Sequence, residues 1–459
     1  MSPRFAHADE PAIDIHLIEE QDLEAAREAL TPAARAWIDA QGFRAKLGQV
    51  VALPLPDGGV DAVLVGWGDH AARRRERFHL AGAPLPPGVY RLETDLPPDS
   101  AEEQALGWLL GQYVFDRYKK ADRPERRLVA PASVDAARVE AIAAGVFFAR
   151  DLVNTPANAL GPAALEDAAR EIAFRHGDRI TVTTGDALIE AGLPLIHAVG
   201  RAGREAPRLI DIAWGPHDGP KVTIVGKGVC FDTGGLDLKP SSAMRLMKKD
   251  MGGAAAALGL AEIVMERRLP ISLRVLIPAV ENAIGPDAFR PGDILTSRKR
   301  LTVEVGNTDA EGRLILADAL TLAAEEEPDL LIDFATLTGA ARVALGPDLP
   351  ALFTDDEALA ADLLTAGVAA RDPLWRLPLW DGYDADISSP VADLDNAPAG
   401  GMAGAITAAL FLRRFAAGAK AWAHVDLYAW NPKAKPGRPA GGELQAARAV
   451  FAMLERRHG

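Results

Sequence analysis

Apolar and polar positions alternate along most of the chain as they do in proteins built from strands and helices in turn. From about residue 134 onward, short apolar runs of strand length are separated by longer alanine-rich runs with helical periodicity. This alternation predicts an α/β fold in which helices flank a central, mainly parallel sheet on both faces. The strand-like runs are RITVTT (179–184), RLIDIAW (208–214), KVTIVG (221–226), LRVLIPAV (273–280), LTVEVG (301–306), DLLIDFATL (329–337) and KAWAHVDLYAW (420–430). The helical runs cover about 164–174, 253–266, 314–326 and 404–416.

The first part of the chain carries a shorter pattern of the same kind. Strand-like runs begin at Gln49 and Asp61, and the clearest helical run covers 101–120. A polar, proline-containing stretch, ADRPERR (121–127), then precedes a long helical run at about 134–153. Such a stretch is typical of a domain boundary. We therefore expect a small N-terminal α/β domain at 1–131 and a larger domain at 132–459.

Two short segments, 227–250 and 306–313, concentrate acidic and basic residues. Each follows an apolar strand-like run and precedes an alanine-rich helical run. Ligands of open parallel sheets bind beyond the carboxyl ends of the strands, so we expect both segments to face one site. The acids are Asp232, Asp250, Asp309 and Glu311, and the bases are Lys227, Lys239 and Arg313.

Four carboxylates in one site need compensating positive charge. Two like charges about 4 Å apart repel by roughly 4 kcal/mol at an effective dielectric constant of about 20. Two divalent ions would balance four carboxylates and use their oxygens as ligands, and the lack of paired histidines or cysteines favours manganese, magnesium or zinc. Lys227 is a candidate neutral amine ligand, because nearby cations disfavour an ammonium group. The charge balance therefore favours a two-metal site.

Hydrolysis is the natural reaction of such a site, because two metal ions activate a water molecule and polarise a carbonyl or phosphoryl group. Lys239 and Arg313 would then stabilise an oxyanion or hold an anionic helper. A purely structural alternative is that Asp250, Asp309 and Glu311 stabilise the starts of helices. A two-metal phosphoesterase also satisfies the charge balance.

Composition restricts the partners of the protein. The formal net charge is −14 and the isoelectric point about 5.2, so no nucleic-acid or anionic membrane partner is expected. The single cysteine, Cys230, excludes an internal disulfide. The N-terminus lacks the apolar region of a secretory signal, and no run of about 18 apolar residues occurs. We expect a cytoplasmic protein.

The two charged segments resemble those of the leucyl aminopeptidase family of cytosolic metallopeptidases. The signature octapeptide of the family appears as NTDAEGRL (307–314), and its other metal-binding segment as GKGVCFDTGGLDLKP (226–240) and MKKDMGGAAA (247–256). The similarity extends from about 145 to about 430 through DLVNTPAN (151–158), DFATLTGA (333–340) and GAITAALFL (404–412). The resemblance implies a metal-dependent aminopeptidase that removes the first residue of peptides with a free N-terminus.

The resemblance also implies roles for individual residues. Two divalent ions, manganese or zinc, would be held by Lys227, Asp232, Asp250, Asp309 and Glu311, with Asp232 and Glu311 bridging them. Lys239 would polarise the scissile carbonyl, and Arg313 would hold a bicarbonate ion that acts as the general base. The substrate-binding positions implied are Met247, Asn307, Thr336 and Gly339.

At the level of assembly, the resemblance implies a homohexamer. Thr233 stands where many members of the family have serine, and the segment after Trp430 departs from the family pattern. An aminopeptidase-like scaffold or binding protein with little peptidase activity is the alternative that the sequence leaves open.

Overall fold

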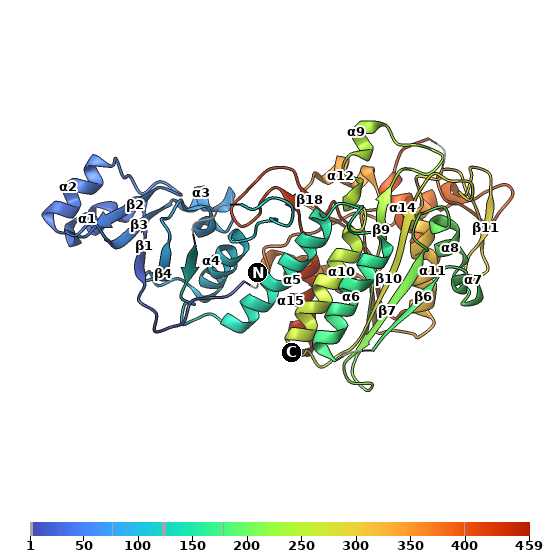
Figure 1. The fold of residues 1–459 in the computed structure, drawn as a ribbon, viewed down its shortest axis with the longest axis horizontal. Helices are drawn as coiled ribbons and strands as arrows, with labels where there is room; N and C mark the ends of the chain where they lie inside the picture. Colours follow the sequence, from blue (N-terminus) through green and yellow to red (C-terminus); the bar gives the residue numbers. More distant parts are fainter. Residues whose placement is uncertain (1–2, 76, 122–124, 178, 399) are drawn as a thin grey trace. The chain divides into compact units, whose positions relative to one another are not determined.

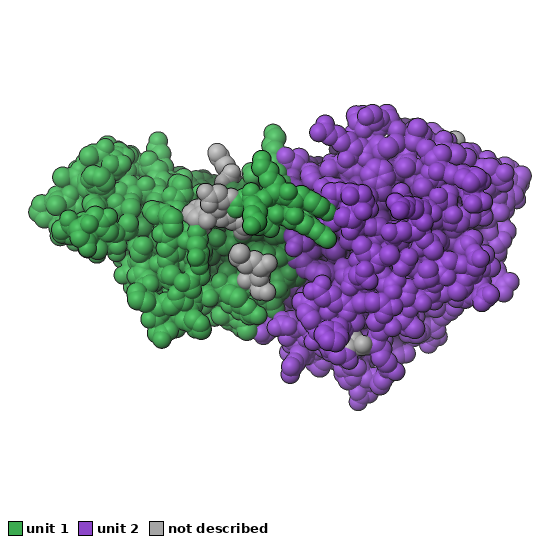
Figure 2. Space-filling view, viewed as in Figure 1, with its two compact units in different colours: residues 1–147, 433–440 green, residues 148–432, 441–459 purple. Residues whose placement is uncertain are grey.

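The computed structural model describes residues 3–75, 77–121, 125–177, 179–398 and 400–459. The chain divides into two compact units, drawn in green and purple in Figure 2. Unit 1 comprises residues 1–147 and 433–440, and unit 2 comprises 148–432 and 441–459. A short piece of the C-terminal sequence therefore belongs to the unit that contains the N-terminus.

Unit 1 is built on a five-stranded sheet with the order β2-β3-β1-β4-β5, within its described residues. The strand-like runs at Gln49 and Asp61 correspond to β2 and β3, whereas β1, at the centre of the sheet, was not predicted. The strands are β1 (Ile13–Glu19), β2 (Val50–Pro54), β3 (Val60–Gly68), β4 (Gly88–Leu92) and β5 (Arg126–Leu128). The helices are α1 (Leu23–Ala29), α2 (Pro32–Ala40), α3 (His70–Arg75), α4 (Pro98–Gly111) and two short 3₁₀ helices, η1 (Glu20–Asp22) and η2 (His79–Gly82).

The helix predicted at 101–120 is wrong at its C-terminal end, because α4 stops at Gly111. Glycine is a poor helix former, and a Cβ atom at this position would lie 3.1 Å from the Cβ atom of Ala81. The close approach of η2 to the last turn of α4 thus favours glycine there. Apolar periodicity alone did not reveal this ending.

Unit 2 is built on a nine-stranded sheet, counted over its described residues (Figure 1). Its central strands run parallel, from β17 through β13 and β8 to β10, while β7 and β6 at one edge and β14 at the other are antiparallel to their inner neighbours. The predicted mainly parallel sheet is confirmed. The strands are β6 (Arg179–Thr184), β7 (Arg208–Trp214), β8 (Lys221–Gly226), β9 (Gly228–Asp232), β10 (Ser272–Asn282), β13 (Leu330–Ala335), β14 (Ala351–Phe353), β15 (Trp375–Arg376) and β17 (Trp422–Asp426).

One predicted strand lies outside this sheet. The run LTVEVG forms β12 (Thr302–Glu304), which pairs with β11 (Ile294–Thr296) and β16 (Leu394–Asp395) in a separate three-stranded sheet. The charged segment 306–313 therefore does not follow a strand of the central sheet, contrary to our expectation. A run this short has the same apolar pattern in either sheet, so only long-range pairing decides where it lies. The remaining strands, β18 (Trp430–Asn431) and β19 (Gly441–Gly442), form a hairpin-like pair.

Helices cover both faces of the central sheet. On one face, the almost entirely buried α10 packs against β8, β13 and α15, and on the other α11 packs with α8 and α14. The helices of unit 2 are α6 (Pro162–His176), α7 (Ala187–Glu190), α8 (Pro194–Gly200), α9 (Ser241–Met244), α10 (Gly252–Glu266), α11 (Gly312–Ala324), α12 (Gly339–Leu345), α13 (Glu357–Ala369), α14 (Gly404–Arg413) and α15 (Ala447–His458), with the 3₁₀ helices η3 (Met247–Lys249) and η4 (Asp381–Ile387). The helix α5 (Ala136–Asn154) contains the boundary between the two units. Within the described residues, no helix combines the length and the apolar character that crossing a membrane requires.

A buried carboxylate joins α11 to the start of α8. Asp318 is fully buried, and its oxygens accept hydrogen bonds from the backbone N–H groups of Leu195 (2.7 Å) and Arg298 (2.8 Å). We expect Asp318→Ala to lower the free energy of unfolding by about 3 kcal/mol, because it leaves buried donors without an acceptor. Chemical denaturation measures this loss. The same change at Asp167, exposed on α6, should have little effect, and an equal loss in both variants would contradict the prediction.

Candidate metal centre

Close backbone packing places the first charged segment at the carboxyl end of β8. Lys227 follows the last residue of β8, and its backbone N–H donates to Phe334 of β13 (2.9 Å). A Cβ atom on Gly253 would lie 2.1 Å from the carbonyl oxygen of Phe334, and one on Gly312 would lie 2.5 Å from Cε of Lys227. Glycine at these two positions thus lets the starts of α10 and α11 close around the lysine.

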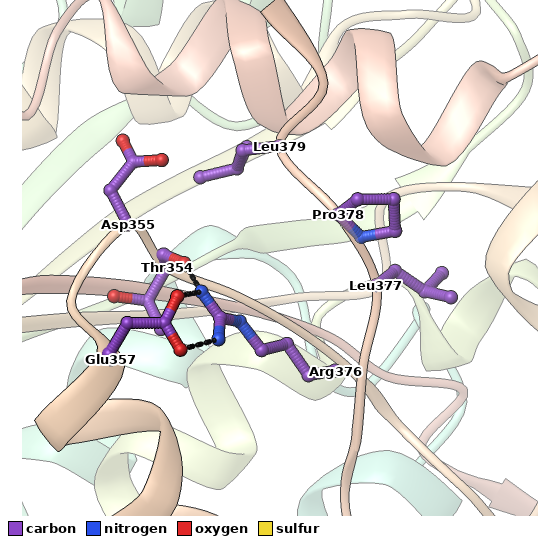
Figure 3. Close-up of a pocket in the computed structure, with 7 residues that line it drawn as sticks. All are labelled: Thr354, Asp355, Glu357, Arg376, Leu377, Pro378 and Leu379. Atoms are coloured by element: carbon purple, nitrogen blue, oxygen red, sulfur yellow. Dashed lines mark hydrogen bonds and ion pairs between the residues drawn. The ribbon is translucent and has the colours of Figure 1, made fainter.

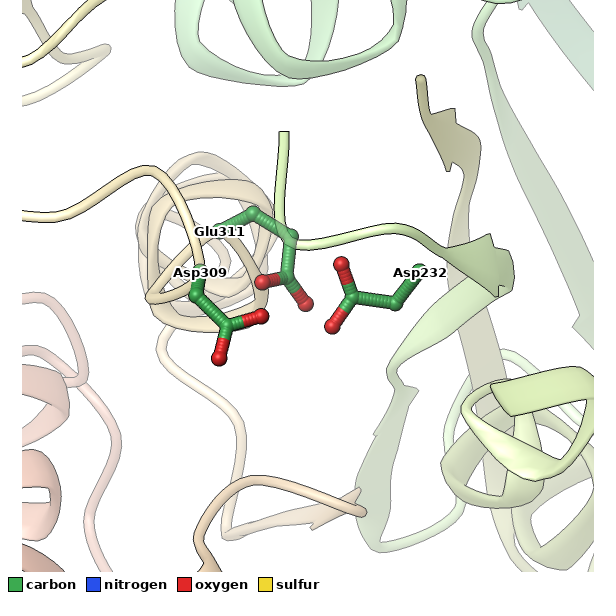
Figure 4. Close-up of side chains that lie close together, drawn as sticks. All are labelled: Asp232, Asp309 and Glu311. Carbon is green, nitrogen blue, oxygen red and sulfur yellow. The ribbon is translucent and has the colours of Figure 1, made fainter. Parts of the chain in front are cut away.

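Three carboxylates from distant parts of the sequence converge in front of these strands (Figure 4). Asp232 ends β9, Asp309 lies in the loop before α11, and Glu311 immediately precedes α11. One oxygen of each lies within 4.8 Å of the others. Asp232 and Glu311 are buried, whereas Asp309 is accessible from one side. This is a spacing at which carboxylate oxygens could coordinate a common cation.

Two lysines connect this group of acids. The Lys227 ammonium lies 2.7 Å from Oδ2 of Asp250 and 3.0 Å from Oε1 of Glu311. Lys239 lies 2.9 Å from Oδ2 of Asp232 and also pairs with Asp309. The fourth acid, Asp250, is thus joined to the other three through Lys227. All four acids and both lysines predicted from sequence belong to one site.

The helix-capping alternative does not account for these acids. Glu311 occupies the N-cap position of α11, and Met251 occupies that of α10, but neither helix start has a side-chain capping hydrogen bond. Asp250 accepts a hydrogen bond from the hydroxyl of Thr336 (2.8 Å) rather than from the first turn of α10. The carboxylates are therefore directed toward one another and the lysines.

Burial and neighbouring charges shift the pKa values of the acids and of Lys227 in the site. Burial, together with the charge of Asp232, raises the pKa of Glu311 to about 8 and that of Asp309 to about 6. Burial acts against the charged form of Lys227, but the carboxylates of Asp250 and Glu311 outweigh it and raise its pKa. A cation in the site would oppose each of these effects, since it favours ionised carboxylates and a neutral amine.

The arrangement fits divalent metal ions. Oδ2 of Asp250, Oδ1 of Asp309 and Oε1 of Glu311 are buried, and within the described part of the chain none of them accepts a hydrogen bond of regular geometry, although a lysine ammonium faces each. Buried carboxylate oxygens normally have such partners. Their oxygens, with the amine of Lys227, form a donor set that hard and borderline divalent ions accept.

Two asparagines that sequence reasoning missed hold the carboxylate loops in place. Asn282, the last residue of β10, donates to Asp232 (2.8 Å) and to the carbonyl of Thr308 (3.1 Å). Asn396 accepts from Gly306 (2.8 Å) and donates to the carbonyl of Asn307 (2.8 Å). Both are buried. Asn282 ends a predicted strand, which is a weak signal, whereas nothing in the local sequence distinguishes Asn396.

The other predicted residues lie around this centre in different settings. Thr336 accepts from the Lys227 ammonium through its carbonyl (3.0 Å), and Asn307 accepts from the backbone of Asp309 (2.7 Å). Met247 begins η3, and Gly339 begins α12 at an exposed position. Asn307 thus has a structural contact within the loop, and a substrate contact of any of these four residues stays a prediction.

Arg313 is buried at the start of α11, and within the described residues it forms no ion pair with the four acids of the site. It donates to the carbonyl of Asn396, and its Nε atom has no hydrogen-bond partner among the described residues. Burial lowers the pKa of Arg313 to about 10, so the side chain remains a cation at neutral pH.

An open pocket of about 470 Å³ lies at the β15 edge of the sheet (Figure 3). Its lining contains none of the predicted site residues, and its most prominent polar feature is the ion pair of Arg376 with Glu357 (2.6 Å). The pocket therefore lacks the converging carboxylates of the metal centre.

Converging carboxylates and lysines beyond the strands of an α/β sheet are typical of metal-dependent hydrolases. Comparison with known proteins specifies the kind of hydrolase. The catalytic-domain model of the cytosol aminopeptidase family matches residues 147–450, and the N-terminal-domain model of M17 aminopeptidases matches residues 13–131. The chain belongs to the cytosol aminopeptidase family and is a metal-dependent aminopeptidase, which hydrolyses the N-terminal residue from peptides.

Similar proteins cover most of the chain. A probable cytosol aminopeptidase of Roseiflexus castenholzii is 45% identical over 79% of this chain and 78% of its own, and one of Geobacter sp. (strain M21) is 42% identical over 78% and 76%. The crystal structure of the cytosol aminopeptidase from Coxiella burnetii has a TM-score of 0.94 at 45% identity and covers 99% of both chains. The bottromycin maturation enzyme BotP in complex with Mn has a TM-score of 0.86 at 35% identity, covering 98% of this chain and 100% of its own.

Proposed function

We propose that this aminopeptidase works with two divalent ions, manganese or zinc, held by Lys227, Asp232, Asp250, Asp309 and Glu311. The observation that carries the proposal is the group of buried carboxylate oxygens that face one another without regular hydrogen bonds. When bound, the two ions supply Lewis-acid polarisation and an activated water. The relative solved with Mn supports manganese.

The residues of the chain then have separate tasks in peptide hydrolysis. Asp232 pairs with Lys239 and Glu311 with Lys227, and in this proposal both carboxylates would be shared by the two ions. Lys239 stabilises the negative charge that develops on the scissile carbonyl oxygen. Asn282 and Asn396 hold the carboxylate loops and thereby fix the ligand oxygens.

Arg313 holds an anionic general base, bicarbonate, in this proposal. Its buried guanidinium has an N–H group without a partner among the described residues, which leaves a donor for a small anion. The carboxylates that act on Arg313 are those of Glu311, Asp426 and Asp395. None of them forms an ion pair with it within the described residues, so a diffusible anion complements the residues of the chain.

At the level of the whole protein, we propose a cytoplasmic homohexamer with Met247, Asn307, Thr336 and Gly339 contacting the peptide substrate. Large apolar side chains on the surface of unit 2 support self-association, because exposed aromatic residues often mark interfaces. They include Trp375 and Trp380, which are 58% and 60% exposed. The molar mass in solution tests the hexamer.

Metal stoichiometry tests the proposed function. After the protein is stripped with a chelator and dialysed, manganese, zinc, magnesium or cobalt is added singly, and bound ions are counted by elemental analysis. We expect two ions per chain at saturation in the wild-type protein. Asp250→Asn should bind one ion or fewer, because it removes one of the five proposed ligands, a carboxylate that lies beside the proposed ligand Lys227. One ion per chain in the active wild-type protein would contradict the two-ion proposal.

A further inference from the structure

Two cations border the proposed metal centre without a carboxylate partner. Lys249 immediately precedes Asp250 and is only 6% exposed. Arg342 lies one turn into α12, and its Nη2 atom lies 3.9 Å from the position that a Cβ atom on Gly339 would take. Within the described residues neither side chain has an ion pair or a side-chain hydrogen bond, whereas most arginines of unit 2 pair with acids, as Arg376 does with Glu357.

Both cations pack on one aromatic ring. The Lys249 ammonium lies 4.9 Å from the ring centroid of Tyr428, and the Arg342 guanidinium lies 5.2 Å from the same centroid. Tyr428 follows β17 by two residues and is half-buried. An aromatic face attracts a cation but carries no net charge, so the ring itself does not cancel the repulsion between Lys249 and Arg342. An anionic group bound there would remove it.

The nearest acids of the chain are already engaged. Asp250 binds Lys227 (2.7 Å) and the hydroxyl of Thr336 (2.8 Å). Asp426 accepts hydrogen bonds from the backbone of Leu337 (3.0 Å) and from the hydroxyl of Thr338 (2.6 Å). Both carboxylates attract Lys249 from a distance, but within the described residues neither forms an ion pair with Lys249 or Arg342. The two cations thus lack a counter-charge in direct contact, and an anionic group from outside the chain would supply one.

We propose that Lys249 and Arg342, together with the ring of Tyr428, form a subsite for the carboxylate of an acidic first residue, Asp or Glu, of the peptide substrate. The inference rests on the proposed function, in which the peptide amino terminus lies at the metal centre. Asp250 connects the two regions, because it is a proposed ligand and the chain neighbour of Lys249. The side chain of the first residue is attached to the same Cα atom as the amino group, so it is the side chain that would lie nearest to the metal centre.

Lys248 provides a matched control for this subsite. It is the neighbour of Lys249 in η3, and its ammonium also packs on an aromatic ring, lying 5.5 Å from the centroid of Trp430. Unlike Lys249, it donates a hydrogen bond to the carbonyl oxygen of Asn154 (2.6 Å). Its charge therefore has a partner in the chain and needs none from the substrate.

The test compares aminoacyl p-nitroanilides of Glu, Gln and Leu with the full-length, metal-loaded enzyme. These substrates have no C-terminal carboxylate, so discrimination between Glu and Gln reports on the side chain alone. We expect the wild-type protein to favour Glu over its neutral isostere at least tenfold in kcat/KM. Lys249→Met and Arg342→Met should bring this ratio close to one, whereas Lys248→Met should preserve it.

Charge reversal makes the test independent of loss of stability. Arg342 is exposed, and Arg342→Glu should favour the Lys over the Glu anilide, a gain that misfolding does not produce. Equal use of Glu and Gln by the wild-type protein, or an unchanged ratio in both neutral variants, would overturn the subsite. The subsite would also be overturned if the enzyme distinguished only the dipeptide Leu-Leu from Leu-Leu amide, because the two cations would then bind the C-terminal carboxylate of the substrate. Failure to cleave the Leu anilide would overturn the proposed function as well.

Discussion

Glu311→Gln is expected to lower kcat/KM for peptide hydrolysis at least about 10³-fold, equivalent to about 4 kcal/mol of transition-state stabilisation. The side chain of Glu311 is buried between Lys227 and the other carboxylates, and one of its oxygens belongs to the converging group. The glutamine amide has the same volume as the glutamate side chain but no charge. Its NH₂ group would direct a hydrogen-bond donor toward the Lys227 ammonium or the proposed metal ions. Steady-state kinetics on unblocked peptides, with metal content measured in parallel, test this expectation.

The fold should survive this substitution. Lys227 keeps Asp250 as a second carboxylate partner, at 2.7 Å, so no unpaired charge is created in the core. Glu325→Gln, at the exposed end of the same helix, is the matched control and should leave activity unchanged, since surface ion pairs contribute at most about 1 kcal/mol. Wild-type activity in Glu311→Gln would contradict a catalytic role for the cluster. The same variant tests the scaffold alternative, because a non-enzymatic role would persist in it.

Lys239→Met is expected to lower kcat about 10²- to 10³-fold with a smaller change in KM, because it removes a cation that stabilises the developing oxyanion. The Lys239 ammonium lies between Asp232 and Asp309, 2.9 Å from the former, in a partly accessible position. Methionine retains the length and flexibility of the chain but carries no charge. Single-turnover kinetics at saturating metal measure the effect on the chemical step.

The metal content of this variant distinguishes catalysis from ligand positioning. If bound metal falls in parallel with activity, Lys239 mainly holds the two acids in place, and the assigned role is wrong. Lys221→Met, at the opposite end of β8, is the control. Among the described residues its ammonium donates only to the carbonyl of Glu326 (3.1 Å), so both activity and metal content should match those of the wild-type protein.

Local pattern predicted the central sheet and its helices well, because these elements are long, apolar and bounded by polar turns. The runs at 208–214 and 221–226 coincide with β7 and β8. Prediction failed where a partner in space decides the structure. The helix at 101–120 stops at Gly111 against η2, and LTVEVG joins a second sheet through β11 and β16. Neither partner is visible in the local sequence.

The acids and lysines of the site were found from sequence because each charged segment lies in an otherwise apolar setting. Which lysine pairs with which acid did not follow from spacing. Lys227 pairs with Asp250 and Glu311 rather than with Asp232, its neighbour in sequence. Asn396 was missed for a related reason, since it lies more than 80 residues beyond the loop that it holds.

The sequence by itself determined the kinds of groups available: four carboxylates, two lysines and an arginine beside strand-like runs of an α/β domain. That inventory already required a counter-charge, and the resemblance to a known family identified the chemistry. Only the tertiary structure decided that Asp232, Asp309 and Glu311 lie within 4.8 Å of one another, and that Lys249 and Arg342 share the ring of Tyr428. The physical reason is that such distances depend on the register of the strands and on the close packing of helix starts that glycine allows. Both bring together residues that are far apart in the chain.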